Sequence, residues 1–174
     1  MKTTKIIYGT TILLVFILLV GCFSAPDKLT TQKPLFPDRH GWGLKQITIA
    51  DTNNNALEFK RVDCVWVIGN ENKPSYEPKV TSLADKLVSM VPAGLVTQKN
   101  DRYSDVKIGD ASFSRKIVLT FKDKKSFTVL IGSPALNKPA YIRLADKKEV
   151  YWIDEPLLKQ LDLNSQAWLN LEEG

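Results

Sequence analysis

The sequence predicts an α+β fold in which a mainly antiparallel sheet is built from β-hairpins and one helix follows each half. Apolar and polar residues alternate along several short segments separated by turn formers, which is typical of paired strands. One longer segment, between Ser75 and Pro92, instead carries apolar residues at helical spacing. At 174 residues and 44% hydrophobic content, the chain is long enough for one sizeable core and short for two.

The first predicted strands form a hairpin. Residues 47–49 and 57–59 alternate in polarity on either side of the turn formers at 51–55. The run at 64–68 is apolar on both faces, so we expect a third strand in the centre of the sheet, covered on each side. Trp66 is the expected core anchor of that strand.

The segment between Ser75 and Pro92 is the first predicted helix. Pro78 fits its first turn, and Pro92 with Gly94 ends it. Its polar face is mixed rather than lysine-rich, which favours packing on the sheet over a role at a membrane surface. The apolar stripe consists of Val80, Leu83, Ala84, Leu87, Val88 and Val91.

The second half of the domain repeats this plan. Alternation at 117–121 and 127–131 around a charged turn predicts another hairpin, and residues 141–144 and 150–153 predict a further strand pair. Because both halves place a helix after strands joined by tight turns, an internal duplication that has diverged is expected.

The last predicted element is a short helix. Asp154-Glu155-Pro156 opens it, and it continues over residues 157–161, which include three leucines. Trp168 and Leu169 are expected to cover the core.

The first 21 residues have the pattern of an export signal. Two lysines precede the continuous apolar run at 12–20, and a polar stretch begins soon after residue 22. Leu19-Val20-Gly21-Cys22 resembles the bacterial lipobox, in which small residues precede the cysteine that receives diacylglycerol. The resemblance implies cleavage between Gly21 and Cys22 and lipid on the Cys22 thiol, a nucleophile suited to that chemistry.

The alternative for this segment is an uncleaved membrane anchor, because residues 6–23 approach the roughly 20 apolar residues that span a bilayer. Either interpretation places the domain outside the cytoplasm. A lipid-anchored protein with Phe23 rather than Asp after the cysteine is expected on the periplasmic face of the outer membrane in a diderm. In a monoderm it is expected on the outer face of the plasma membrane. The membrane is thus the first expected partner, and an envelope protein is the second.

The remaining chain divides into a tether, residues 22–43, and a folded domain, residues 44–174. The tether contains three prolines and two glycines with few apolar residues. Loss of the leader removes two lysines and lowers the formal charge from +5 to +3. Basic residues elsewhere are interleaved with acids, as in Lys122-Asp123-Lys124-Lys125, so no nucleic-acid partner is expected.

No motif in the sequence points to catalysis. His40, the sole histidine, lies in the predicted tether, where no scaffold would hold a general base. Cys64 begins an apolar run and is expected to be a buried, inert thiol. The turn at 51–55 echoes a calcium loop, but Ala56 and Val62 stand where that loop requires Gly and Glu. We therefore expect no metal, no cofactor and no enzyme activity.

These observations favour a lipid-anchored binding or scaffolding module. The alternative is an envelope hydrolase that cleaves cell-wall glycan with paired carboxylates, although turn and capping roles account for the acids present. Aromatic and arginine side chains are favoured in interfaces, and ordinary cross-strand packing is the competing explanation for them. The candidate ligand surface consists of Tyr141, Arg143, Tyr151 and Trp152.

Several short motifs together carry a family resemblance. They are the hairpin with the Trp-bearing strand Val65-Trp66-Val67, the helix after Tyr76, Ile131-Gly132, Tyr141-Ile142-Arg143 and Val150-Tyr151. Over about residues 44–171 the chain resembles the bacterial family called domain of unknown function 4340, whose members are often membrane-anchored or lipoproteins. Some relatives resemble partners of gliding-type transport systems, which implies an accessory role in envelope transport. The chain departs from the family pattern at 103–109, where a Tyr-Gly-Leu run followed by Pro is common.

Overall fold

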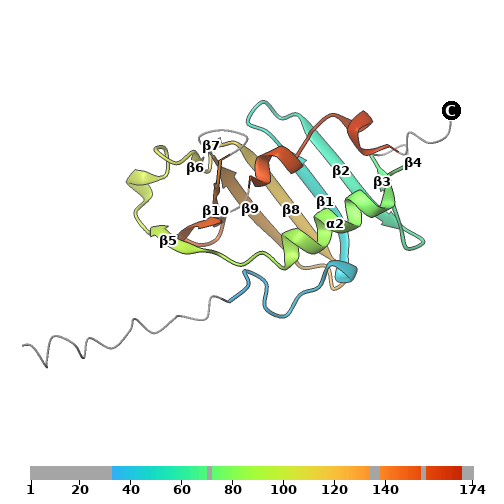
Figure 1. Ribbon diagram of the computed structural model, residues 1–174, viewed down its shortest axis with the longest axis horizontal. Coiled ribbons are helices and arrows are strands. Elements are labelled where there is room, and N and C mark those ends of the chain that lie inside the picture. Colours follow the sequence, from blue (N-terminus) through green and yellow to red (C-terminus); the bar gives the residue numbers. More distant parts are fainter. Residues whose placement is uncertain (1–32, 70–71, 134–137, 154–155, 170–174) are drawn as a thin grey trace, which may run out of the picture. The chain divides into compact units, whose positions relative to one another are not determined.

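The computed structural model describes residues 33–69, 72–133, 138–153 and 156–169, and one antiparallel sheet dominates them (Figure 1). The described residues supply nine strands to this sheet, in the order β4-β3-β2-β1-β8-β9-β10-β11-β5. Every pair of neighbouring strands is antiparallel. The predicted α+β class with a mainly antiparallel sheet is confirmed.

The first half of the sheet is a meander followed by the helix. Strand β1 (Leu44–Ala50) pairs with β2 (Ala56–Val62), β2 pairs with β3 (Val65–Ile68), and β3 pairs with the short strand β4 (Lys73–Pro74). Helix α2 (Glu77–Val88) then crosses one face of the sheet (Figure 1).

The second half continues outward from the middle of the sheet. Strand β8 (Arg115–Phe121) pairs with β9 (Ser126–Gly132), and β9 pairs with β10 (Ala140–Leu144). Strand β10 in turn pairs with β11 (Val150–Ile153). The far edge is β5 (Gly94–Thr97). The smaller elements are β6 (Ile108–Gly109), β7 (Ser112–Phe113) and four 3-10 turns, η1 (Gly41–Gly43), η2 (Asn100–Arg102), η3 (Leu157–Gln160) and η4 (Ser165–Trp168).

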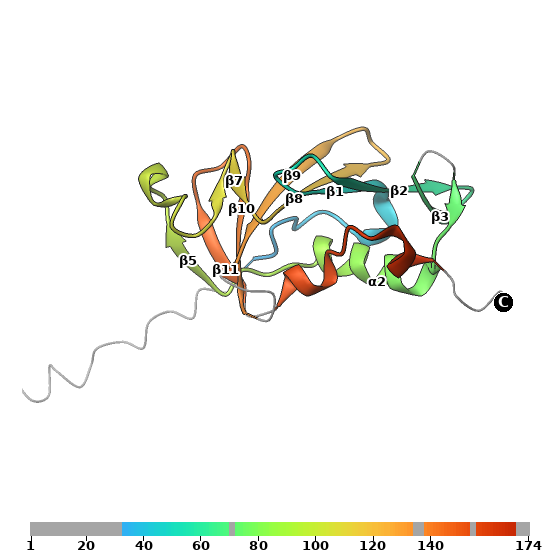
Figure 2. The same ribbon diagram turned by 90° about the horizontal axis from the view of Figure 1, so that it is seen from above.

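The two halves meet where β1 pairs with β8. Ile47 lies opposite Leu119 and Ile49 opposite Ile117, and all four side chains are fully buried. Figure 2 shows α2 and the C-terminal turns along one face of the sheet, which encloses the main core between them.

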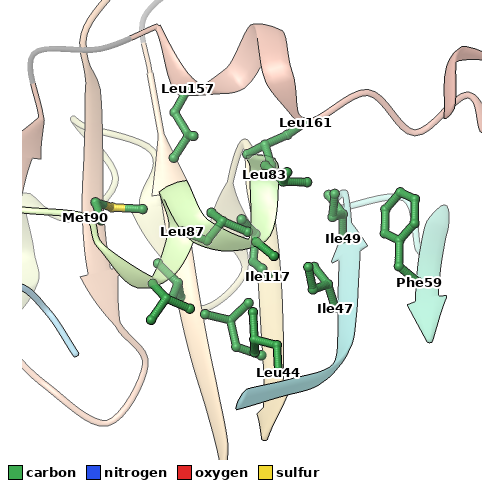
Figure 3. Packing of buried hydrophobic residues seen from close by; sticks show 14 of the residues in the cluster. Leu44, Ile47, Ile49, Phe59, Leu83, Leu87, Met90, Ile117, Leu157 and Leu161 are labelled. Carbon is green, nitrogen blue, oxygen red and sulfur yellow. The ribbon is translucent and has the colours of Figure 1, made fainter. Parts of the chain in front are cut away.

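Helix α2 covers this core with the predicted stripe. Leu83 and Leu87 lie against Ile47 and Ile117 of the sheet (Figure 3). The helix ends at Val88, earlier than predicted, so Val91 lies outside it and is 45% exposed. The buried members are Val80, Leu83, Ala84, Leu87 and Val88.

The end of the described chain also packs on the main core. The predicted helix after residue 154 is a single 3-10 turn, η3, whose leucines are buried. Trp168 is 1% exposed, stands edge-on to Phe59 with ring centroids 4.9 Å apart, and donates from Nε1 to the carbonyl oxygen of Asp162 at 2.9 Å. The prediction that Trp168 covers the core is confirmed.

Two expectations about the third strand were wrong. Strand β3 lies next to the edge strand β4 rather than in the centre, and Val65 is 49% exposed, although Trp66 is fully buried as predicted. Cys64 is exposed rather than buried, because Asp63 and Cys64 form the two-residue turn between β2 and β3. Both have positive φ, 48° and 70°, as the primed turns of tight hairpins require.

The described part of the predicted tether, residues 33–43, packs on the domain. Phe36 is 4% exposed and stands edge-on to Phe127 at 5.3 Å. Gly41 lies so close to α2 that a Cβ there would fall 3.1 Å from the Cα of Asp85. Folded structure therefore extends before Leu44, because the apolar side chain of Phe36 supplies contacts that a count of prolines and glycines does not show.

Asp51 organises the β1–β2 turn, and its charge makes that turn sensitive to pH. Its carboxylate accepts hydrogen bonds from the backbone nitrogens of Asn53 (2.8 Å) and Asn55 (3.0 Å) and from the Asn55 side chain (2.9 Å). The Asn55 side-chain bond, together with these backbone bonds, lowers the pKa of Asp51 below its ordinary value of 3.8. The stabilisation is therefore complete above that ordinary value and is lost as the pH falls through the lowered pKa.

We expect Asp51→Asn to melt below wild type near neutral pH and the gap to close in strong acid. Thermal unfolding followed by circular dichroism at a series of pH values measures this. Asp105→Asn, which removes another exposed acid, serves as the control and should leave a smaller gap. A gap for Asp51→Asn that persists unchanged in strong acid would contradict the charge-based explanation.

Candidate functional site

The predicted lipid site lies outside the described residues. Gly21 and Cys22 both belong to the segment 1–32, so the lipid assignment rests on sequence. Within the part of the chain that the structure describes, no helix is long and apolar enough to cross a membrane.

Three residues of the candidate ligand surface, Tyr141, Arg143 and Trp152, share one face of the sheet, and Tyr151 lies on the other face. Tyr141 of β10 lies opposite Trp152 of β11, and Trp152 is 37% exposed. Tyr151 pairs with Ile142 and packs against the main core, on the opposite face of the sheet from its neighbour Trp152. Both tyrosines are partly buried: Tyr151 packs against the main core, and Tyr141 packs against a smaller buried cluster.

Arg143 is 5% exposed and its donors are used inside the protein. Its Nε donates to the carbonyl of Ile108 at 3.2 Å, and Nη1 donates to the carbonyls of Ala145 (3.2 Å) and Lys147 (3.1 Å). Its Nη2 forms an ion pair with Asp110. The guanidinium therefore fastens the segment before β8 to the β10–β11 turn.

A second, smaller core lies under this arginine. It is built from buried Tyr103, Ile108, Leu130 and Val150, and the Arg143 guanidinium lies 4.6 Å from the Tyr103 ring centroid. Gly132 lets the same segment approach, because a Cβ there would fall 2.1 Å from the carbonyl oxygen of Val106. The motif residues Gly132 and Arg143 thus act in packing.

A different place brings cationic and aromatic side chains together. A hollow of about 460 Å³ opens beside η1, where β1 runs between β2 and β8. Two hydrogen bonds bring its walls close. The Lys122 backbone nitrogen donates to the Gly43 carbonyl at 2.9 Å, and the Arg61 side chain donates from Nη1 to the Trp42 carbonyl at 3.2 Å. The lining residues are Trp42, Lys45, Arg61, Cys64 and Lys122.

Trp42 is the most exposed large apolar side chain among the described residues, at 68%. Its ring stacks on His40, with centroids 5.8 Å apart and planes 11° apart, and Lys122 Nζ lies 5.5 Å from the ring centroid. The Trp42 indole is therefore held by His40 and Lys122 while most of its surface faces solvent. Arg61 lies over the Trp66 ring at 5.0 Å, and its buried Nε has no hydrogen-bond partner among the described residues.

A second hollow, of about 190 Å³, shares Trp42 and Lys122 with the first. His40, Asp38 and Asp123 line it together with Arg39. Arg39 Nη1 donates to Asp123 at 2.8 Å, and this contact lowers the pKa of Asp123 below its ordinary value. Arg39 thereby compensates the negative charge of Asp123.

The chemistry-bearing residues are spread over this region. Cys64 lines the larger hollow and His40 the smaller one. Among the described residues no three His, Cys, Asp or Glu side chains form a group able to hold a metal ion. Sequence reasoning missed the larger hollow, and the available signal was a tryptophan between two glycines, Gly41-Trp42-Gly43, in a stretch that was interpreted as a tether.

The fold is an α+β domain with one large antiparallel sheet and a helix across one face, and its comparison with known families gives one result. The chain belongs to the family described as a domain of unknown function (DUF4340), whose model matches residues 66–172. This confirms the resemblance found in the sequence. The match begins at Trp66, so β1 and β2, with Lys45 and Arg61, precede the matched part. No curated protein and no solved structure matches the chain.

Proposed function

We propose that this protein is a lipid-anchored component of the bacterial cell envelope, acylated at Cys22, whose domain is a non-catalytic binding or scaffolding module. The observation that carries the proposal is the leader that ends in Leu19-Val20-Gly21-Cys22. Its more specific form, an accessory to an envelope transport system, rests on the resemblance of some relatives to partners of gliding-type transport systems.

The geometry around Trp42 supports binding over chemistry. Its larger hollow presents an indole and three cationic side chains, which recognise ligands by stacking and charge. Covalent catalysis needs a nucleophile within hydrogen-bond reach of a base. Cys64 and His40 instead line different hollows.

Lipid attachment is tested by growing cells with a clickable fatty-acid analogue and purifying the full chain. Wild type should carry the label, and Cys22→Ala should carry none, because its thiol receives the lipid. Cys64→Ala is the matched control, since it removes the only other cysteine, and it should be labelled like wild type. The mature chain should begin at Cys22 by mass.

Two outcomes would count against this function. Unlabelled wild-type protein that begins at Met1 would refute the anchor. Cleavage of purified cell-wall glycan by the full chain would favour the carboxylate hydrolase over a non-catalytic module.

We also propose that the two halves of the domain descend from a duplication. The sheet order supports this, because β1 and β8 lie side by side at the centre and each half proceeds outward from there. The helical element that follows is α2 in the first half and the shorter η3 in the second.

A further inference from the structure

We propose that the surface around Trp42 docks on the anionic lipid headgroups of the membrane that holds the anchor. This surface, the Trp42 face, consists of Trp42, Lys45, Arg61 and Lys122, which line one hollow. The inference rests on the proposed anchor, because the tether is what keeps this face near a bilayer.

Charge is the first reason. Lys45, Arg61 and Lys122 line one hollow, and no carboxylate lines it among the described residues. Cations near an anionic bilayer are attracted to it, by about fivefold in the bound-to-free ratio for each Lys or Arg. Two acids are close in sequence to this group. Asp123, next to Lys122, is paired with Arg39, and Asp63, at the hairpin tip, offsets part of the attraction.

An exposed apolar side chain is the second reason. Trp42 is 68% exposed, more than any other large apolar side chain among the described residues. Tryptophan is enriched at the membrane interface, where the indole body enters the headgroup region and its N–H stays hydrated. A surface that combines cations with an exposed indole matches a membrane interface better than either feature alone.

The third reason is reach. About 20 residues separate Cys22 from Trp42, which span at most about 70 Å when fully extended. Part of that segment packs on the domain, since Phe36 is buried, and this shortens the free length. A domain held this close meets the bilayer at high effective concentration, so a weak surface suffices.

A free soluble anion fits the Trp42 face less well. Lys45 and Lys122 are exposed, and a phosphate in water gains little from exposed lysines. Such an ion also leaves the exposed indole of Trp42 in water, whereas the headgroup region of a bilayer accommodates it.

The test uses the full acylated chain, reconstituted into phosphatidylcholine vesicles whose acyl chains carry bromine, with or without phosphatidylglycerol. Bromine quenches indole fluorescence by contact, and the difference between wild type and Trp42→Ala isolates the Trp42 signal. We expect strong quenching of Trp42 with phosphatidylglycerol, weak quenching without it, and loss of the difference in high salt. Thermal unfolding checks that each variant is folded.

The lysine variants make the test quantitative. Lys45→Gln with Lys122→Gln should lower the docked-to-undocked ratio about 25-fold, from the fivefold effect of each cation. Lys147→Gln with Lys148→Gln is the matched control and should leave the ratio unchanged, because these lysines lie in the turn between β10 and β11, nearer the β5 edge of the sheet, and do not line the hollow.

Three results would overturn the docking. Equal quenching of Trp42 with and without phosphatidylglycerol would exclude anionic lipid as the ligand of the Trp42 face. A change in Trp42 fluorescence on adding glycerol phosphate alone would assign the hollow to a soluble anion. Shielding in native membranes but not in protein-free vesicles would assign it to a protein. Acylation is read separately by mass, so an unacylated chain whose Trp42 still responds to phosphatidylglycerol refutes the anchor and leaves the surface standing.

Discussion

Replacing Trp66 with alanine is expected to destabilise the domain by about 3–5 kcal/mol. The Trp66 side chain is fully buried in the main core. Its removal therefore leaves an apolar cavity inside the protein and removes the packing contacts of the indole. Domains of this size are stable by about 5–15 kcal/mol, so the loss would remove much of the folded state. Urea unfolding followed by circular dichroism measures the difference.

The two buried tryptophans offer a matched comparison with phenylalanine. Trp66 Nε1 is buried without a hydrogen-bond partner among the described residues, so Trp66→Phe removes a polar group that makes no such bond. Trp168→Phe instead breaks the 2.9 Å bond to the Asp162 carbonyl. We expect Trp168→Phe to cost about 1 kcal/mol more than Trp66→Phe. The reverse order would show that ring packing, rather than hydrogen bonding, separates the two sites.

Residue patterns predicted the faces of the sheet well, because alternation depends only on local geometry. The apolar residues at 47–49 and 117–121 point to the main core as expected. The order of strands depends instead on pairing between distant segments. Strand β3 was placed in the centre because both its faces are apolar, but β4, a Lys-Pro pair too short to show a pattern, lies beyond it at the edge.

The position of Cys64 shows a limit of turn signals. A two-residue hairpin turn is recognised by Asn-Gly or Asp-Gly, whose second residue adopts positive φ without strain. This chain has Asp63-Cys64 there, so the cysteine was counted with the following strand and assigned to the core. The structure places it at the exposed tip, which shifts the start of β3 by one residue.

The Trp42 face could not be read from sequence for a related reason. Lys45, Arg61 and Lys122 come from β1, from β2 and from the residue after β8, and only the β2-β1-β8 order brings them together. Arg143 is the opposite case. Its residue type suggested a ligand surface, but its guanidinium donates to groups inside the protein, including the carbonyl of Ile108, 35 residues away in the sequence.

Replacing Arg143 with methionine is expected to loosen the segment 103–110 and to cost about 3 kcal/mol of stability. The long apolar side chain keeps most of the packing on Tyr103 but leaves the Ile108 carbonyl without the donor that it has in a buried site. The carbonyls of Ala145 and Lys147 lose the same guanidinium. Hydrogen exchange should show the loss first at the Ile108 amide, which donates to the Tyr103 carbonyl at 2.9 Å, while amides of β1 and β8 remain protected.

Asp110→Asn tests how much of the Arg143 contribution to stability comes from its ion pair with Asp110 and how much from its hydrogen bonds to carbonyls. The Asp110 side chain is 85% exposed, so its pairing with Arg143 is screened by water and its removal should change stability little. Arg143→Lys retains the positive charge but not the several donors of the guanidinium. One ammonium cannot reach both the Ile108 carbonyl and the carbonyls of the β10–β11 turn. If Asp110→Asn weakened Ile108 protection as much as Arg143→Met does, the ion pair rather than the buried hydrogen bonds would hold this segment in place.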